Sequence, residues 1–265
     1  MRPNVRTLAL LCVVTLGCFA GQSAASEKTT HARLGPIGVT APRVVTSAGA
    51  RPFHLIRFAP GKGVRLEAVW LGGRAGRANT VGAYVNANRG RGAVGGINGD
   101  FFILARNVPS GNLFIHRGQN FLGNTERGAA VFAPDGSVDI RAGGVQSGAL
   151  LQEGVREATS GKPVYVDARR VGFLGTLEPY QRNPAYQRAA IGRFGNGDTA
   201  LVVVGGAGLP ARAFAQGLIR LGLVEALGMD IDSSANLNWR GASLNRPGYQ
   251  RQMPTGTIIF YRPVG

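Results

Sequence analysis

The spacing of apolar and polar residues along this chain predicts more strands than helices. Residues 64–70 alternate well enough between apolar and polar positions to form a half-buried strand. The continuous apolar run at 201–204 is followed by glycine, which is consistent with a central strand. Further strands are expected at residues 93–97, 113–119, 129–132, 137–141, 226–229 and 256–261.

Two segments have the spacing of short helices. Thr80 can cap a helix that ends near Gly90, and Pro210 suits the first turn of a helix that Gly222 can close. Residues 142–187 show a weaker signal. We therefore expect an α+β fold, with a mixed β-sheet flanked by a few short helices.

The length and the composition along the chain favour one globular domain. The chain has 265 residues, 44% of them hydrophobic, which is enough to bury a full core. Residues 26–50 are polar, rich in Ala, Thr and Pro, and lack periodicity, so we interpret them as a linker. Residues 51–265 contain no visible repeat or second linker, and we expect them to form one domain.

The first 25 residues have the pattern of a secretory signal peptide. Arg2 and Arg6 precede an apolar run at 8–20, and small residues follow at 23–25. The alternative is lipidation at Cys18, although Thr15 does not fit a lipoprotein cleavage box. The run is too short for a comfortable membrane span, so we expect a secreted, periplasmic or cell-envelope protein whose mature chain has no transmembrane span.

Cysteine usage narrows the possible chemistry. Cys12 and Cys18 both lie in this leader, so the mature chain has no thiol. That excludes disulfides, a cysteine nucleophile and a cysteine-ligated metal from the mature protein.

The chain is strongly basic, and nearly all of its basic residues are arginine. The formal charge is +16, which falls to +14 once Arg2 and Arg6 are removed. The arginines are dispersed and accompany no nucleic-acid motif, so we expect no nucleic-acid partner. For an exported protein, an anionic glycan or a phosphodiester is the expected partner, and a solvated surface without a specific partner is the alternative.

A polar turn after the strand at 93–97 is the first candidate for chemistry. Asn98, Gly99 and Asp100 follow the apolar run, and two phenylalanines follow them. Gly99 allows a sharp turn or a close approach to a ligand, and the strand end would present the amide and the carboxylate together. A tight turn with a satisfied Asn and Asp is the alternative.

Two later segments add further polar candidates. Asp230 and Asp232 lie two residues apart just after an expected strand, with Ser234 behind them. Such carboxylates can divide acid and base roles or bind a hard cation, and a polar turn is the alternative. Arg188 begins a strand-like segment and could offer its guanidinium to a phosphate or carboxylate, or form a surface ion pair.

Taken in order, these pieces resemble the phosphodiester glycosidase family. Its best-known members remove a covering N-acetylglucosamine from a phosphate on lysosomal-enzyme mannose, and many members are exported by bacteria. Residues 98–102 match the family's Asn-Gly-[Gly/Asp]-Phe-Phe turn, and residues 188–192 are close to its Arg-[Thr/Ser]-Ala-Ile-Gly. Residues 226–235 approximate its Ala-Leu-Asn-Leu-Asp-Gly-Gly-Gly-Ser-Ser, and the resemblance spans residues 80–261.

The last of these motifs departs from the family pattern. The three glycines that follow the aspartate in the family are here Ile231, Asp232 and Ser233. Glycines there indicate positive φ angles or close ligand approach, to which isoleucine is poorly suited. The second half of the expected site is therefore remodelled.

The resemblance implies an exported hydrolase that cleaves a sugar–phosphate diester at the glycosidic bond. Our expectation is that Arg188 holds the phosphate, Asp230 is nucleophile or base, and Asp100 is an acid or an orienting group. The expected substrate-binding residues are Asn98, Gly99, Ser234 and Asp232. The competing hypothesis is a non-catalytic envelope protein that binds anionic glycan through its arginines.

The sequence assigns no cofactor and no metal. His31, His54 and His116 do not form a metal-ligand pattern. His116 follows the first motif closely enough to reach the site, but we interpret it as a partly exposed strand histidine.

Overall fold

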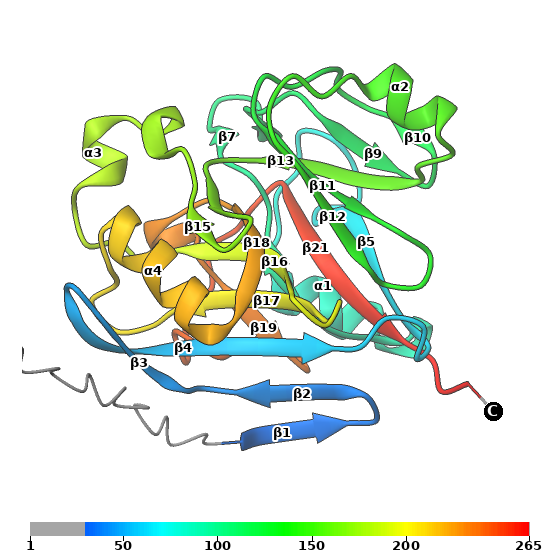
Figure 1. The fold of residues 1–265 in the computed structure, drawn as a ribbon. Helices are drawn as coiled ribbons and strands as arrows, with labels where there is room; N and C mark the ends of the chain where they lie inside the picture. The colour runs from blue at the N-terminus through cyan, green and yellow to red at the C-terminus, as the bar shows by residue number, and fades with distance from the viewer. Residues whose placement is uncertain (1–29, 265) are drawn as a thin grey trace, which may run out of the picture.

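The computed structural model describes residues 30–264, and its strands form three larger sheets and one small one (Figure 1). The largest sheet has nine strands in the order β1-β2-β4-β17-β16-β18-β14-β15, with β3 paired to β4. Its strands are β1 (Thr30–Leu34), β2 (Ile37–Thr40), β3 (Arg43–Thr46), β4 (Gly49–Phe58), β14 (Val164–Asp167), β15 (Arg170–Val171), β16 (Ala189–Phe194), β17 (Thr199–Val204) and β18 (Leu223–Gly228).

Two five-stranded sheets pack beside it. One has the order β10-β9-β13-β11-β12 and the other the order β20-β19-β6-β21-β5. The strands of the first are β9 (Phe114–His116), β10 (Gln119–Asn120), β11 (Gly128–Phe132), β12 (Val138–Arg141) and β13 (Glu157–Gly161). Those of the second are β5 (Val64–Trp70), β6 (Ala93–Asn98), β19 (Leu237–Trp239), β20 (Ala242–Ser243) and β21 (Thr255–Tyr261). A short hairpin joins β7 (Phe102–Ile103) to β8 (Val108–Pro109).

Four short helices accompany the sheets within the described residues. They are α1 (Val81–Ala87), α2 (Ser147–Gln152), α3 (Pro179–Arg182) and α4 (Ala211–Leu221). The expected caps are present, because the Thr80 hydroxyl accepts a hydrogen bond from Ala83 N and Gly222 ends α4 with a φ of 100°. The helix after Thr80 ends at Ala87, before the expected Gly90, and a 3₁₀ turn follows.

The expected α+β class with a few short helices is confirmed, but the single mixed sheet is not. Every strand pair among residues 30–264 is antiparallel, and the strands divide among several sheets. Antiparallel neighbours need only short connections, which is why strands separated by tight turns pair directly here.

The linker interpretation of residues 26–50 is wrong for residues 30–50. This segment forms β1, β2, β3 and the start of β4, and β2 pairs with β4 along its length. Ile37 and Val39 are fully buried in the core, so two apolar residues in a short alternating strand outweighed the polar composition around them. Residues 26–29 and the expected signal peptide at 1–25 lie outside the described residues.

The core lies mainly where the three sheets meet. Buried side chains from all three, such as Ile56, Leu66 and Phe114, belong to one cluster. A second cluster lies between the large sheet and α4, where Phe53 stacks on Phe214 with ring centroids 5.6 Å apart. Figure 1 shows α4 against one face of this sheet. Within residues 30–264, no helix has the length and apolar character needed to span a membrane.

The placement of β2 in the core can be tested by matched valine truncations. Val39→Ala is expected to lower the free energy of unfolding by about 1–3 kcal/mol, because Val39 is fully buried. Val45→Ala, at a β3 position that is 51% exposed, is expected to change it by about 0.5 kcal/mol or less. Urea denaturation measures both, and equal effects would contradict this placement.

Candidate active site

The candidate site lies where β6 ends beside the segment that follows β18. The Asp230 N–H donates to the Gly99 carbonyl over 3.0 Å, which joins the two segments directly. The Asn98 side chain reinforces this join, since its Nδ2 donates to the Asp230 carbonyl (3.0 Å) and its Oδ1 accepts from Asn236 N (3.0 Å). Two of the three sequence motifs therefore meet in the folded chain, and the third lies beside them, because β16 pairs with β18 and the Asp232 N–H donates to the Gln187 carbonyl over 2.7 Å.

The glycines beside Asp100 are required by packing. A Cβ atom on Gly99 would lie 2.2 Å from Thr255 Oγ1, and one on Gly111 would lie 2.1 Å from Asp100 Oδ2. Both distances are below van der Waals contact, so a side chain at either position displaces its neighbours. Asn98 is fully buried, and its side chain bonds to the backbone of the segment at residues 230–236. Asn98 and Gly99, which were expected to bind substrate, therefore join the two segments in the structure.

Asp100 is fully buried, and three groups hold its carboxylate. Oδ1 accepts from Phe101 N over 2.8 Å, and Oδ2 accepts from Ser160 Oγ over 2.8 Å and from Arg127 Nη1 over 3.4 Å. Burial raises the pKa of Asp100 above its usual value, while Arg127 and these hydrogen bonds oppose the rise. Because it is fully buried and three donors already hold it, Asp100 suits an orienting role.

Asp230 is the more accessible of the two carboxyl groups, although it is only 8% exposed. Burial raises its pKa to about 7, and the nearby Asp100 contributes to the rise. Hydrogen bonds from Ile231 N (2.8 Å) and the Ser234 hydroxyl oppose it. A carboxyl group with this pKa can both hold and release a proton near neutral pH.

Three cations, Arg127, Lys162 and Arg251, interact with these carboxyl groups, and none of them is the arginine expected from the sequence. Lys162 and Arg127 both interact electrostatically with Asp100, and Lys162 also interacts with Asp230. Burial lowers the pKa of Lys162, and the charge of Arg127 lowers it further. Arg251 interacts with Asp230 and donates to Ser233 Oγ over 2.6 Å.

Arg188 does not have the free guanidinium that phosphate binding requires. It is fully buried, and its Nε donates to the Leu209 carbonyl over 2.6 Å. Its terminal nitrogens donate to the Tyr165 hydroxyl (3.1 Å) and to the carbonyls of Gln181, Arg182 and Pro184. The expected phosphate contact is therefore corrected, because backbone carbonyls of α3, Pro184 and Leu209 and the Tyr165 hydroxyl already accept from these donors.

Arg188 nevertheless acts on the site indirectly. It fixes the end of α3, and the Gln181 side chain of that helix accepts a hydrogen bond from Lys162 Nζ over 3.3 Å. Lys162 Nζ also lies 5.0 Å from the centre of the Phe101 ring. Arg188 is thus a positioning residue for Lys162, a cation that interacts electrostatically with both carboxyl groups.

The remodelled glycine segment is accommodated without strain at Ile231. Ile231 has extended backbone, with φ −113° and ψ 179°, and the left-handed φ of 58° falls on Asp232. Aspartate tolerates that conformation better than a branched residue does. The Asp232 side chain is 59% exposed and lies 3.8 Å from Arg246, which leaves the polar role in this turn to Ser234.

Sequence reasoning missed Arg127, Ser160, Lys162 and Arg251. These residues come from segments without a recognisable motif, and the structure brings them to the carboxyl groups only through the sheet arrangement. Lys162 did carry one signal, since it is among only three lysines in an arginine-rich chain.

The geometry and the sequence together define the class of protein. Residues 91–260 match the pattern of the phosphodiester glycosidase family, which covers more than half of the chain. This chain belongs to that family. A comparison with curated proteins found no match.

Two solved structures have the same fold. The zebrafish N-acetylglucosamine-1-phosphodiester alpha-N-acetylglucosaminidase catalytic domain, auto-inhibited by its pro-peptide, aligns with a TM-score of 0.71 and 16% identity, over 89% of this chain and 88% of that one. A hypothetical protein from Synechocystis aligns with a TM-score of 0.67 and 16% identity over 86% of this chain. This chain spans 62% of the length of the Synechocystis protein.

The raised pKa of Asp230 makes the ionised form costly to the fold. With a pKa of about 7 in the folded protein against an ordinary value of 3.8, the folded state binds the proton more strongly than the unfolded state. Stability is therefore expected to fall as pH rises from about 4 to about 7.

Asp230→Asn removes this dependence, because the amide stays neutral and can still accept from Ile231 N. The difference in unfolding free energy between the variant and the wild type is expected to grow in favour of the variant by a few kcal/mol from pH 4.5 to pH 8. Chemical denaturation at both pH values measures the gain. Parallel behaviour of the two proteins would show that Asp230 ionises normally.

Proposed function

We propose that this chain is an exported hydrolase that cleaves a sugar–phosphate diester at the glycosidic bond. One observation supports this above all: two buried carboxyl groups, Asp100 and Asp230, interact with each other and with the cations Arg127, Lys162 and Arg251, in a chain of the phosphodiester glycosidase family. The proposal of export rests on the leader-like pattern of residues 1–25.

The cations suit the phosphate of such a substrate. Lys162, Arg127 and Arg251 supply three positive charges around two carboxyl groups, one of which is largely protonated at mildly acidic pH. A phosphodiester carries one negative charge, which these side chains attract more strongly in a poorly solvated site than in water. The phosphate end of the substrate is therefore placed beside Lys162 and Arg127.

Asp230 acts at the sugar. In its ionised form it serves as nucleophile or general base. The bond from the anomeric carbon to the phosphate oxygen breaks, water finally supplies the new oxygen on that carbon, and the proton that water loses passes to Asp230 or to the departing phosphate. The bonding electrons leave with the phosphate, which departs as a monoester anion held by the cations. Because phosphate is a good leaving group, Asp100 need only keep Arg127 and Ser160 in place.

Turnover of an N-acetylglucosamine-1-phosphodiester tests this function. With release of free N-acetylglucosamine as the readout, Asp230→Asn is expected to lower kcat at least 100-fold. Lys162→Met is expected to raise KM, because it removes charge from the phosphate contact. Asp139→Asn, at a side chain that is 60% exposed, serves as the matched control and is expected to leave both constants unchanged.

The contrary outcome identifies the competing function. Salt-sensitive binding of an anionic glycan without any release of sugar would establish a binding protein in place of an enzyme. Full activity of Asp230→Asn would remove Asp230 from the mechanism.

The pH profile gives an independent check on the role of Asp230. Since the base must be ionised and its pKa is about 7, kcat/KM is expected to fall about tenfold per pH unit below that value. Loss of the Lys162 charge is expected to lower activity again at alkaline pH. An acid limb near pH 4 would mean that a carboxyl group with an ordinary pKa is the base.

A further inference from the structure

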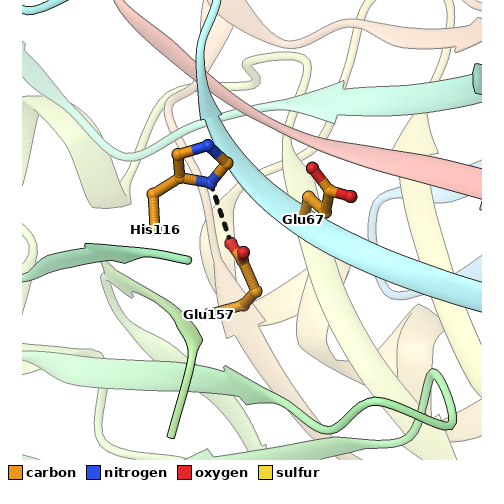
Figure 2. Close-up of side chains that lie close together, drawn as sticks. All are labelled: Glu67, His116 and Glu157. Carbon is orange, nitrogen blue, oxygen red and sulfur yellow. Dashed lines mark hydrogen bonds and ion pairs between the residues drawn. The ribbon is translucent and has the colours of Figure 1, made fainter. Parts of the chain in front are cut away.

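A second cluster of ionisable side chains lies between the two five-stranded sheets. Glu67 on β5, His116 on β9 and Glu157 on β13 each offer one oxygen or nitrogen, and these atoms all lie within 4.8 Å of one another. Figure 2 shows the three side chains close together, with the bond between His116 and Glu157 drawn. We propose that they bind one divalent cation of the first transition row, for which Zn²⁺ is the representative.

Glu157 is already oriented for this role. Its Oε1 accepts from Arg117 N over 2.9 Å, and its Oε2 accepts from Ala68 N over 3.0 Å. His116 Nδ1 lies 3.2 Å from the same Oε2. Backbone N–H groups thus fix the carboxylate, which is how surrounding hydrogen bonds orient metal ligands, and each oxygen keeps a further lone pair.

Glu67 supplies the second, independent indication of a ligand. It is only 7% exposed, and within residues 30–264 no hydrogen-bond donor reaches its buried Oε2. Arg65 binds the other oxygen, Oε1, over 2.9 Å, and Arg117 Nη2 stays 3.9 Å from Oε2. A buried carboxylate oxygen that accepts no hydrogen bond from the described residues is costly, even with a guanidinium 3.9 Å away, and a cation between the three side chains would reduce that cost.

The ligand types and the available space agree with a transition-metal ion. One imidazole with two carboxylates suits Zn²⁺ and its neighbours better than Mg²⁺ or Ca²⁺, which take oxygen ligands. Donor atoms of one tetrahedral ion with bonds of about 2.0–2.2 Å lie about 3.4 Å apart, so donors that are now up to 4.8 Å apart must move together on binding. A cavity of about 330 Å³ adjoins the cluster on the side of Glu67 and Glu157, which line it while His116 does not, and it has room for water as a further ligand.

Positive charge around the cavity opposes the cation and limits how tightly it is held. Arg65, Arg91, Arg117 and Arg156 also line this space. Arg65 and Arg117 partly neutralise Glu67, so the ion must compete with them for the carboxylate. The negative charges of Glu67 and Glu157 favour the ion locally, and Glu67 Oε2, which accepts no hydrogen bond within the described part of the chain, favours it further.

The position of this cluster assigns it a structural role. β5 belongs to one five-stranded sheet, and β9 and β13 belong to the other, so an ion bound there would tie the two sheets together. β13 also carries Ser160, which donates to Asp100. The metal would therefore brace the strand behind Asp100 without contacting the substrate.

Zn²⁺ titration of the metal-stripped protein tests the proposal. Isothermal titration calorimetry is expected to show one ion bound per chain, and thermal denaturation a higher Tm with Zn²⁺ than without. Glu67→Gln and His116→Gln are each expected to weaken binding at least tenfold and to reduce the Tm rise. Glu153→Gln, at an exposed glutamate with 48% of its side chain accessible, is the matched control and should bind as the wild type does.

Two results would overturn the proposal. One is no saturable binding of Zn²⁺ by the wild-type protein. The other is binding that Glu67→Gln and His116→Gln leave unchanged while circular dichroism shows both to be folded. If Glu67→Gln fails to fold, His116→Gln decides alone, since its imidazole makes one contact in this cluster and its side chain is 17% exposed.

Discussion

The join between the end of β6 and the segment after β18 is the constraint on which the candidate site depends. The Asp230 N–H bonds the Gly99 carbonyl, and the buried Asn98 amide secures both segments. These polar groups are shielded from water, so each lost bond would leave an unsatisfied partner. The join therefore fixes where the two carboxyl groups lie, and the raised pKa of each follows from that burial.

Burial of these groups opposes the stability of the fold and favours the proposed chemistry. A carboxyl group that ionises near pH 7 is costly to enclose, but it can exchange a proton under physiological conditions. Lys162 and Arg127 offset part of that cost, and the same charges attract a phosphodiester. Stability and proposed function thus act in opposite directions on Asp230, as they do at many active sites.

Arg188 shows that a residue type does not settle its role. An arginine in a family-like motif suggests phosphate contact, but this one donates to backbone carbonyls and to a tyrosine hydroxyl. Five donors in a rigid plane serve backbone oxygens as well as they serve phosphate. Its effect on the site passes through α3, Gln181 and Lys162.

Features with a local physical cause could be predicted from the sequence. The Thr80 cap, the Gly222 helix end, the strands at β5 and β17 and the family turn at residues 98–102 depend on spacing and on backbone preferences. The pairing of the strands into sheets and the inclusion of residues 30–50 in the core depend on the whole fold. So do the approach of Arg127 and Lys162 to the buried carboxyl groups and the grouping of Glu67, His116 and Glu157. Those contacts join distant segments, and they arise only when burial of the strands fixes their order and register.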